Sequence, residues 1–436
     1  MKAGWLVIAL CASADGAPKL EVAAPATLDD PCLDKACRKH ALDGFRTALA
    51  AQRAHTAAHP LRVSWFGDSL TADDQITDGL RHRLAGLVGD GGPGFVFGAP
   101  PHPFCQHRAL ARSVSEEWTV HGIAAPIAAD RLLGLGGSTE TQAGGTLRFV
   151  PTTQVTSIEL HYLAQPNGGS LELVADGTQV TKLDTRASAK KSMFLAVELP
   201  TSSKAIELRA RGRVRLFGAS FEAKVGAVVD NLGIVNATAK AMHDHNMAEH
   251  WHNQLAHRAP DLVVIMYGTN EAEWLSPKGS SMDDHEKLFG EILATARAAV
   301  PDAACLVISP LDQLDWHDEK MPPRAFQKPQ SDMPSDSPMV NACSSFDQGC
   351  SVMRASGSNA GPSSFWTPAS MTRMPTTMAT VVRPKRVPVL SAAAASTRPS
   401  AMPAAASRTP AKKRRGRLIN ARPCRARPAA EEAGRG

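Results

Sequence analysis

Two blocks of the chain alternate continuous apolar runs with amphipathic segments, and this alternation constrains the fold more than any other feature. The first block opens with the run Leu61 to Phe66, and a helical pattern follows from about Ile76 to Val88. The second block, residues 225–322, holds a helical pattern from about Ala237 to His257, then DLVVIMYG, HEKLFGEILATARAAV and ACLVISP. Apolar strands that alternate with helices predict an α/β domain whose parallel sheet is covered on both faces.

Between these blocks the pattern changes to short strands of alternating polarity. No helical period interrupts the stretches SIELHYL, LELVADGTQVTKL, MFLAVELP and AIELRARGRVRLFGASFEA, and Asp176-Gly177 is a strong hairpin signal. We therefore expect an all-β, sandwich-like module at residues 104–224. It would be inserted between two halves of the α/β domain, residues 30–103 and 225–322.

From about Arg324 the composition changes again. Only three Leu or Ile occur in the last 113 residues, where Pro, Ser, Ala, Arg and Met dominate. Such a segment cannot bury enough apolar surface to offset the entropy of ordering it, so residues 323–436 are expected to be a disordered tail. The tail also carries the basic charge, because residues 381–436 hold 14 Lys/Arg against 2 Asp/Glu and the chain as a whole is only +6. We expect no nucleic-acid partner, since the basic run Ala411 to Arg417 is a solvated part of that tail.

The N-terminus has the features of a short secretory signal. Lys2 precedes an apolar run at residues 5–10, and Ala12-Ser13-Ala14 fits a cleavage site. Residues 1–14 are therefore expected to be a signal peptide, with an N-terminal strand as the alternative, and the protein to be secreted or periplasmic. No other segment approaches the length of a membrane span, so we expect no membrane insertion, and we expect a monomer.

Cysteine spacing leaves two possibilities open near residue 35. Cys32 and Cys37 flank the start of a helical pattern and could form a local disulfide in an exported protein, or could be two reduced thiols. The absence of C-x-x-C pairs argues against a structural zinc site, and we expect neither a metal nor a cofactor.

The stretch SWFGDSLTADD places Ser69 between an apolar strand and a helical segment, where several hydrolase folds hold a nucleophile. A serine nucleophile needs a base and oxyanion donors. The elbow G-x-S-x-G is absent, because Thr71 occupies the place of its second glycine. Gly233 lies in VVDNLGIVNATA, in an expected loop before a helix, and Asn270 directly follows the strand VVIMY. Parallel sheets place their sites at strand ends, so these two residues and the Ser69 N–H could form a three-donor oxyanion hole.

The blocks FGDSL, LGIVNA and YGTNE, in this order, resemble the first three sequence blocks of the SGNH/GDSL hydrolases. The resemblance covers about residues 61–310 and implies a flavodoxin-like three-layer fold. It also implies that Ser69 is the nucleophile and that Ser69, Gly233 and Asn270 are the oxyanion donors. The β insert, with GDGGPGF and GLGG near its start, is similar to that of bacterial peptidoglycan O-acetylesterases, where it resembles a carbohydrate-binding jelly roll. This implies an esterase that removes acyl groups, O-acetyl above all, from a polysaccharide such as peptidoglycan.

The same residues allow simpler interpretations. Ser69 could cap the helix that begins near Ile76, and Asn270 could form an Asx turn after its strand. His245, Glu249 and His252 follow the spacing i, i+4, i+7 that metal ligands on one helix would have, but we favour a solvated polar face for them.

The family's last block, D-x-x-H, is missing, and no histidine follows His317. One explanation is an inactive SGNH-like carbohydrate-binding protein, or an alternative base in Asp315-Trp316-His317. The other, which we favour, is a shift of the reading frame downstream of MPPRAF, because aliphatic content falls at the same point.

Overall fold

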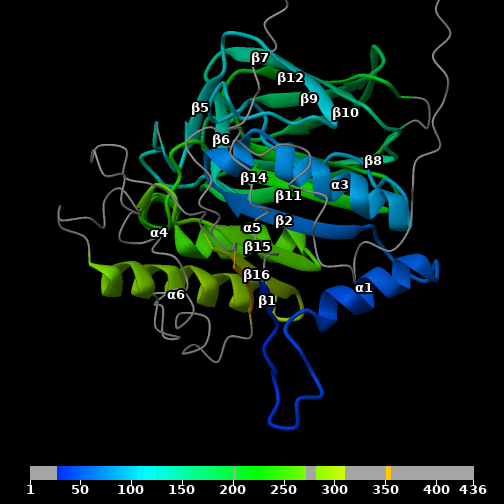
Figure 1. Cartoon of the computed structure of the whole chain (residues 1–436). Coiled ribbons are helices and arrows are strands. Elements are labelled where there is room, and N and C mark those ends of the chain that lie inside the picture. Colours follow the sequence, from blue (N-terminus) through cyan, green and yellow to red (C-terminus); the bar gives the residue numbers. More distant parts are fainter. Residues whose placement is uncertain (1–26, 125, 200–202, 272–280, 310–349, 355–436) are drawn as a thin grey trace, which may run out of the picture. The chain divides into compact units, whose positions relative to one another are not determined.

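A mostly parallel sheet forms the centre of the first of two units, Met1–Thr380 (Figure 1). This computed structural model describes residues 27–124, 126–199, 203–271, 281–309 and 350–354. The strand order is β1 (Thr27–Asp29), β17 (Ser351–Arg354), β16 (Ala304–Ile308), β15 (Leu262–Met266), β2 (Leu61–Gly67) and β14 (Ala227–Gly233). Every neighbouring pair is parallel except β1 with β17. The expected α/β class with a parallel sheet is therefore confirmed.

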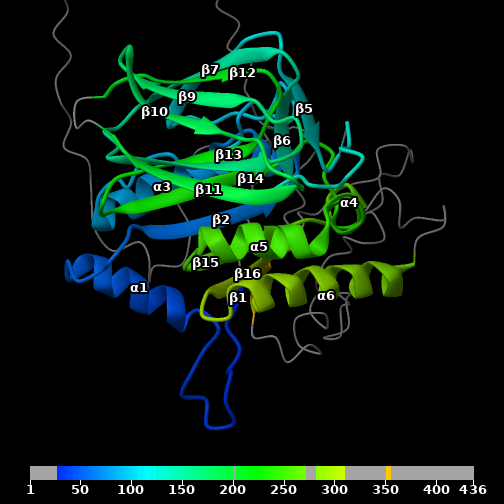
Figure 2. The same cartoon turned by 180° about the vertical axis from the view of Figure 1, so that it is seen from behind.

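Alternate residues of a strand point to opposite sides, so this sheet presents apolar side chains on both faces. Helices cover each of the two faces. On one face, α1 (Asp43–Arg53) and α3 (Gln75–Val88) share a core with strand residues such as Trp65. On the other, α4 (Ala239–His245), α5 (Ala248–Arg258) and α6 (Met282–Ala299) pack against strand residues such as Phe66. Figure 2 shows α5 and α6 side by side on that face.

The single helix expected from Ala237 to His257 is wrong, because the chain breaks at Asn246 and Met247. Both have extended backbone between α4 and α5. The buried Asn246 side chain donates a hydrogen bond to the Gly134 carbonyl at 3.0 Å. This contact to a residue far away in sequence fixes the break, and no helical periodicity reports it.

Between β2 and β14 in the chain, the remaining strands form two antiparallel sheets (Figure 2). One has the order β10-β9-β12-β7-β4 and the other β11-β8-β13-β6-β5, with β3 beside β13. The bounds are β3 (Gly94–Val96), β4 (Leu110–Val114), β5 (Thr119–Gly122), β6 (Gly137–Thr141), β7 (Gly144–Pro151), β8 (Ser157–Ala164), β9 (Ser170–Ala175), β10 (Thr178–Asp184), β11 (Lys191–Glu198), β12 (Ile206–Arg211) and β13 (Val214–Glu222). A single apolar core takes side chains from both sheets, among them Phe149, Leu173 and Phe221. Asp176 and Gly177 both have positive φ in the β9–β10 turn, as the hairpin signal predicts.

A buried network of charges connects these strands to the parallel sheet. Arg258 of α5 donates to Asp230 of β14 at 2.8 Å through Nε and Nη2, and through Nη1 to Glu222 of β13. Asp230 also accepts hydrogen bonds from the Ser64 hydroxyl of β2 and the Phe95 amide of β3, both at 2.7 Å. Because buried charges are stable only when paired, the network specifies how β13, β14 and α5 meet.

Residues 350–354 differ from the expectation of a tail without structure. Strand β17 lies between β16 and β1, and Cys350 forms a disulfide with Cys305 of β16. The composition of the surrounding segment hides this strand, since it has only four residues and its pairing partners are far away in sequence.

The N-terminal region also differs in part from its pattern. Cys32 and Cys37 form a disulfide, which settles the open alternative, and the helix begins only at Asp43. Residues 1–26 and 355–436, and with them the expected signal peptide and most of the expected tail, lie outside the described residues. Within the described residues no helix has the length and apolar character that crossing a membrane requires.

Candidate active site

Ser69 opens a short helix directly after the central strand β2. Gly67 ends that strand, Asp68 caps the helix, and α2 spans Ser69–Ala72. The Asp68 carboxylate accepts the Leu70 amide at 2.9 Å. Asp74, and not Ser69, is the capping residue of α3, so the interpretation of Ser69 as the cap of that helix is wrong. Ser69 is half-buried, and its hydroxyl has no hydrogen-bond partner among the described residues.

Two glycines allow α2 to lie directly on the strand ends. Gly233 pairs with Gly67 in the register of β14 and β2. A Cβ at Gly233 would lie 2.4 Å from the Ala72 nitrogen, and one at Gly67 would lie 2.1 Å from the Thr71 hydroxyl. Since real contacts of that kind do not occur, both positions require glycine, and the nucleophile helix is fixed against β2 and β14.

The Gly233 backbone N–H is already used inside β14. It donates to the Asn231 side-chain oxygen at 3.0 Å, and the Asn231 amide in turn donates to Asp74 and to the Gln106 carbonyl, both at 3.2 Å. Gly233 is also the last residue of the strand, not part of the loop that the sequence suggested. Gly233 therefore lies directly against α2, but in this conformation its backbone N–H is not free to bind an oxyanion.

Asn236, in the loop after β14, has an unpaired backbone N–H that was not predicted from the sequence. It is exposed, its φ is 63°, and its backbone N–H has no partner among the described residues. Asn tolerates this left-handed conformation better than most residues, so the Asn in LGIVNA is the signal that could have indicated it.

Asn270 follows β15 and reaches across to the same loop. Its side-chain N–H donates to the Ala237 carbonyl at 2.8 Å. The Asx turn considered above would involve residue 272, which lies outside the described residues. The neighbouring Glu271 carboxylate accepts the Gly268 amide at 3.0 Å and the Ala239 amide at the start of α4. These contacts hold the loops after β14 and β15 together. Ser69, Gly233 and Asn270 thus lie at the carboxyl ends of three adjacent strands, β2, β14 and β15.

Buried acids lie beneath this edge. Burial raises the pKa of Asp68. Burial, together with the nearby Asp68 charge, raises the pKa of Glu271 to about 7, although the Ala239 and Gly268 amides oppose the shift. Burial and these two carboxylates also raise the pKa of the Tyr267 hydroxyl. The surroundings of the strand ends therefore have a low dielectric, in which oriented donors act strongly on a developing charge.

No described residue supplies a base to Ser69, and Asp315, Trp316 and His317 lie outside the described residues. The histidines around the α4–α5 break are not gathered on one face. His245 contacts the Ile123 carbonyl through Nδ1 at 2.6 Å, and His252 is half-buried on α5, where its Nδ1 contacts the side-chain oxygen of Asn253 at 3.3 Å. Among the described residues, Cys32, Cys37 and His40 have possible ligand atoms within 4.8 Å of one another, but both cysteines are in the disulfide.

Comparisons with known proteins agree with this geometry. The model of the GDSL-like Lipase/Acylhydrolase family matches residues 204–405, a range that includes Gly233 and Asn270. A solved peptidoglycan O-acetylesterase superposes with a TM-score of 0.60 at 19% identity, over 75% of this chain and 85% of the other. At this identity the match shows a common fold.

Two further matches carry no argument. A family two carbohydrate esterase from Clostridium thermocellum has a TM-score of 0.18 at 10% identity, over 47% of this chain and 80% of the other. A 4-coumarate–CoA ligase of Halorhodospira halophila is 32% identical over 72 residues, which are 16% of this chain and only 18% of the ligase.

Proposed function

From the premise that this chain is similar to the SGNH/GDSL hydrolases, and among them to the peptidoglycan O-acetylesterases, we propose that it is a serine esterase. Its substrate would be an acyl ester, O-acetyl above all, on a polysaccharide such as peptidoglycan. The observation that carries the proposal is the meeting of Ser69, Gly233 and Asn270 at the ends of β2, β14 and β15. Three separate sequence blocks converge there.

In this proposal the Ser69 hydroxyl attacks the ester carbonyl. The oxyanion that forms would be bound by the Ser69 N–H at the start of α2 and by the Asn270 side-chain amide. Gly233 would provide a third N–H if the Asn231 side chain turned away, and it also admits α2 to the strand ends.

Proton transfer is the step for which the described residues offer no group, since none of them makes a hydrogen bond to the Ser69 hydroxyl. A serine hydroxyl is weakly nucleophilic until a base removes its proton, and no histidine follows His317 in the sequence. The alternative function, an inactive SGNH-like protein that binds carbohydrate, is supported by this same absence.

The wider organisation belongs to the proposal as well. Residues 30–103 and 225–322 would form the hydrolase domain, and residues 104–224 an inserted jelly-roll-like module that holds glycan. Residues 1–14 would be a signal peptide, which places the monomeric protein outside the cytoplasm, where a cell-wall polysaccharide is accessible. Residues 323–436 would form the tail, except that β17 belongs to the sheet.

A rescue experiment separates the two functions. Release of acetate from an O-acetylated glycan is measured with and without added imidazole, which can act as the missing base. Wild type should show an imidazole-dependent rate above that of imidazole alone, and Ser69→Ala should not. Equal rates for the two proteins would eliminate the serine esterase, and glycan binding without turnover would support the alternative.

A further inference from the structure

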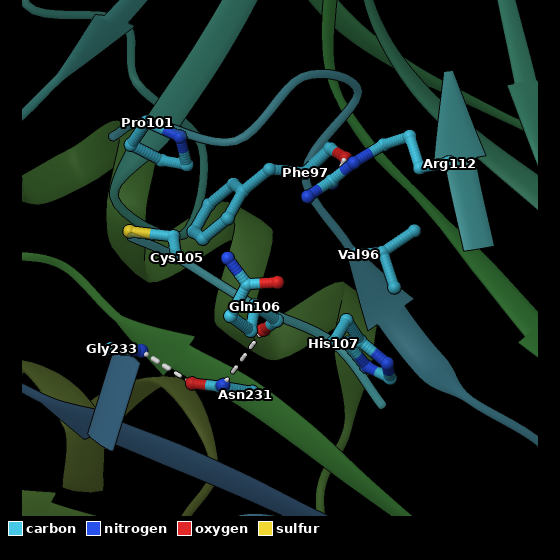
Figure 3. A pocket seen from close by; sticks show the side chains of 9 residues that line it. All are labelled: Val96, Phe97, Pro101, Cys105, Gln106, His107, Arg112, Asn231 and Gly233. Carbon is cyan, nitrogen blue, oxygen red and sulfur yellow. Dashed lines mark hydrogen bonds between the residues drawn. The ribbon is translucent and has the colours of Figure 1, made fainter. Parts of the chain in front are cut away.

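A small pocket lies beside Gly233, between the end of β14 and the loop that follows β3 (Figure 3). Its lining includes Gln106, His107, Arg112 and Asn231, together with the apolar side chains Val96 and Phe97. The enclosed space is about 10 Å³, which holds one water-sized group. The backbone N–H of Gln106 donates to the Ala72 carbonyl at the end of α2, at 2.8 Å. This hydrogen bond connects the wall of the pocket to the helix that carries Ser69.

Arg112 is an unusual cation in this protein. The buried arginines Arg81, Arg215 and Arg258 each pair with at least one carboxylate. Arg112 donates through Nη1 to the Phe97 carbonyl at 2.6 Å, and no carboxylate of the described part of the chain pairs with it. Burial lowers the pKa of Arg112 to about 10, as expected for a charge without a counter-ion.

His107 also lacks partners. Both of its ring nitrogens are shielded from solvent, and neither has a hydrogen-bond partner among the described residues. A buried imidazole without any partner is costly, so a ligand that accepts its N–H would stabilise it. Burial lowers the pKa of His107 to about 4, which leaves it neutral at pH 7 with one N–H to donate.

The neighbouring acid does not satisfy either group. Asp74 faces His107 electrostatically, but its carboxylate already accepts from Arg81, Thr77, the Arg108 amide and Asn231. Arg81 pairs with both Asp74 and Asp78. Since no carboxylate of the described residues pairs with Arg112, its positive charge remains available to a ligand.

We propose that this pocket binds a small carboxylate, with Arg112 as the cation; His107, whose ring nitrogens are shielded in this conformation, becomes a second donor only once its ring turns toward the bound anion. The planar guanidinium matches a carboxylate, and the enclosed space admits one oxygen while the rest of the anion lies in the mouth. The choice of a carboxylate rests on the proposed function, because hydrolysis of an O-acetyl ester releases acetate next to Gly233. The pocket would then retain the released acid beside the strand ends.

The test measures binding, not turnover, so that it is independent of the esterase activity. Acetate is titrated into the full-length Ser69→Ala protein, and binding is followed by saturation-transfer NMR of its methyl group. Acetamide, which has the same shape without the charge, is the matched ligand. Acetate should bind and acetamide should not, at constant ionic strength in chloride. Equal signals for the two ligands would overturn the proposal.

Substitution of Arg112 tests the assigned cation. Arg112→Met keeps the length of the side chain and removes its charge, and should weaken acetate binding at least tenfold, while Arg112→Lys should retain most of it. Unchanged binding in Arg112→Met would overturn the assignment.

If Arg112→Met does not fold, the pKa of His107 in the otherwise unsubstituted protein decides. The charges that face this ring come from Asp74, Arg81, Arg112 and Asp230, so an added anion should raise its pKa. Acetate should produce that rise and acetamide should not; no rise with acetate would overturn the proposal.

Discussion

Glu271→Gln is expected to change how the stability of the fold depends on pH. The carboxyl of Glu271 is only 6% exposed, and its pKa is about 7 in place of the usual 4.5. Between these two values the folded protein keeps a proton that the unfolded chain has lost. The free energy of unfolding therefore falls as pH rises through this window, by about 3 kcal/mol in total.

The glutamine variant removes the ionisation but not the whole contact. Glu271 accepts one backbone amide on each oxygen, from Gly268 and Ala239, and glutamine can accept only through its single oxygen. One buried N–H loses its acceptor, at a cost of about 1–3 kcal/mol. The variant should thus be less stable than wild type near pH 5, and this deficit should shrink or reverse near pH 8.

Urea unfolding followed by tryptophan fluorescence at both pH values measures this difference. Glu249→Gln, at an exposed position of α5, is the matched control and should show no change in pH dependence. Because other groups titrate in the same range, only the difference between variant and wild type counts. Parallel stability curves for Glu271→Gln and wild type would refute the assignment of a protonated buried carboxyl.

Four other substitutions or observations test the fold and the site. Arg258→Met leaves the buried Asp230 without its cation and removes one of the two arginines that pair with Glu222, so it should lower the free energy of unfolding by about 3–5 kcal/mol, measured in urea. Gly233→Ala places a methyl group against the backbone of α2 and should reduce both stability and any Ser69-dependent hydrolysis, whereas Gly86→Ala, where nothing lies within 4 Å, should not. Cys305 and Cys350 should appear as one linked peptide in non-reducing mass spectrometry, and no such peptide would show that β17 is misplaced. Resequencing should reveal, in another frame downstream of the MPPRAF codons, a D-x-x-H followed by an amphipathic helix, and its absence in every frame would eliminate this explanation.

Strands β15 and β16 could be predicted because each is a continuous apolar run, which a parallel sheet buried on both faces requires. Asn270 could be placed near the carboxyl end of β15 for the same reason, whereas β14 contains Asp230 and Asn231 and Gly233 was expected in a loop. What the sequence does not contain are the long-range contacts. The break at Asn246 depends on the Gly134 carbonyl, and the engagement of the Gly233 N–H depends on how the Asn231 amide is oriented by Asp74.

Two further features could not be predicted from the sequence pattern. Strand β17 is too short to show an alternating pattern, and its surroundings have the composition of a tail. The sequence does not show which group an arginine pairs with. That Arg112 has no carboxylate partner among the described residues therefore appears only in the structure.

The most direct test of the central claim is to find the acyl group on Ser69. The protein is incubated with an activated acetyl ester, quenched in acid and digested, and the peptides are analysed by mass spectrometry. With an activated ester the leaving group is good, so Ser69 can be acylated slowly while its proton passes to the buffer. The serine ester that forms is less reactive and no described residue activates water to attack it, so an acetyl-enzyme should accumulate. We predict one acetyl group on the peptide that contains Ser69 in wild type, much less in Asn270→Ala, and none on that peptide in Ser69→Ala. Acetylation spread over lysines, with none on Ser69, would contradict the assignment of Ser69 as the nucleophile.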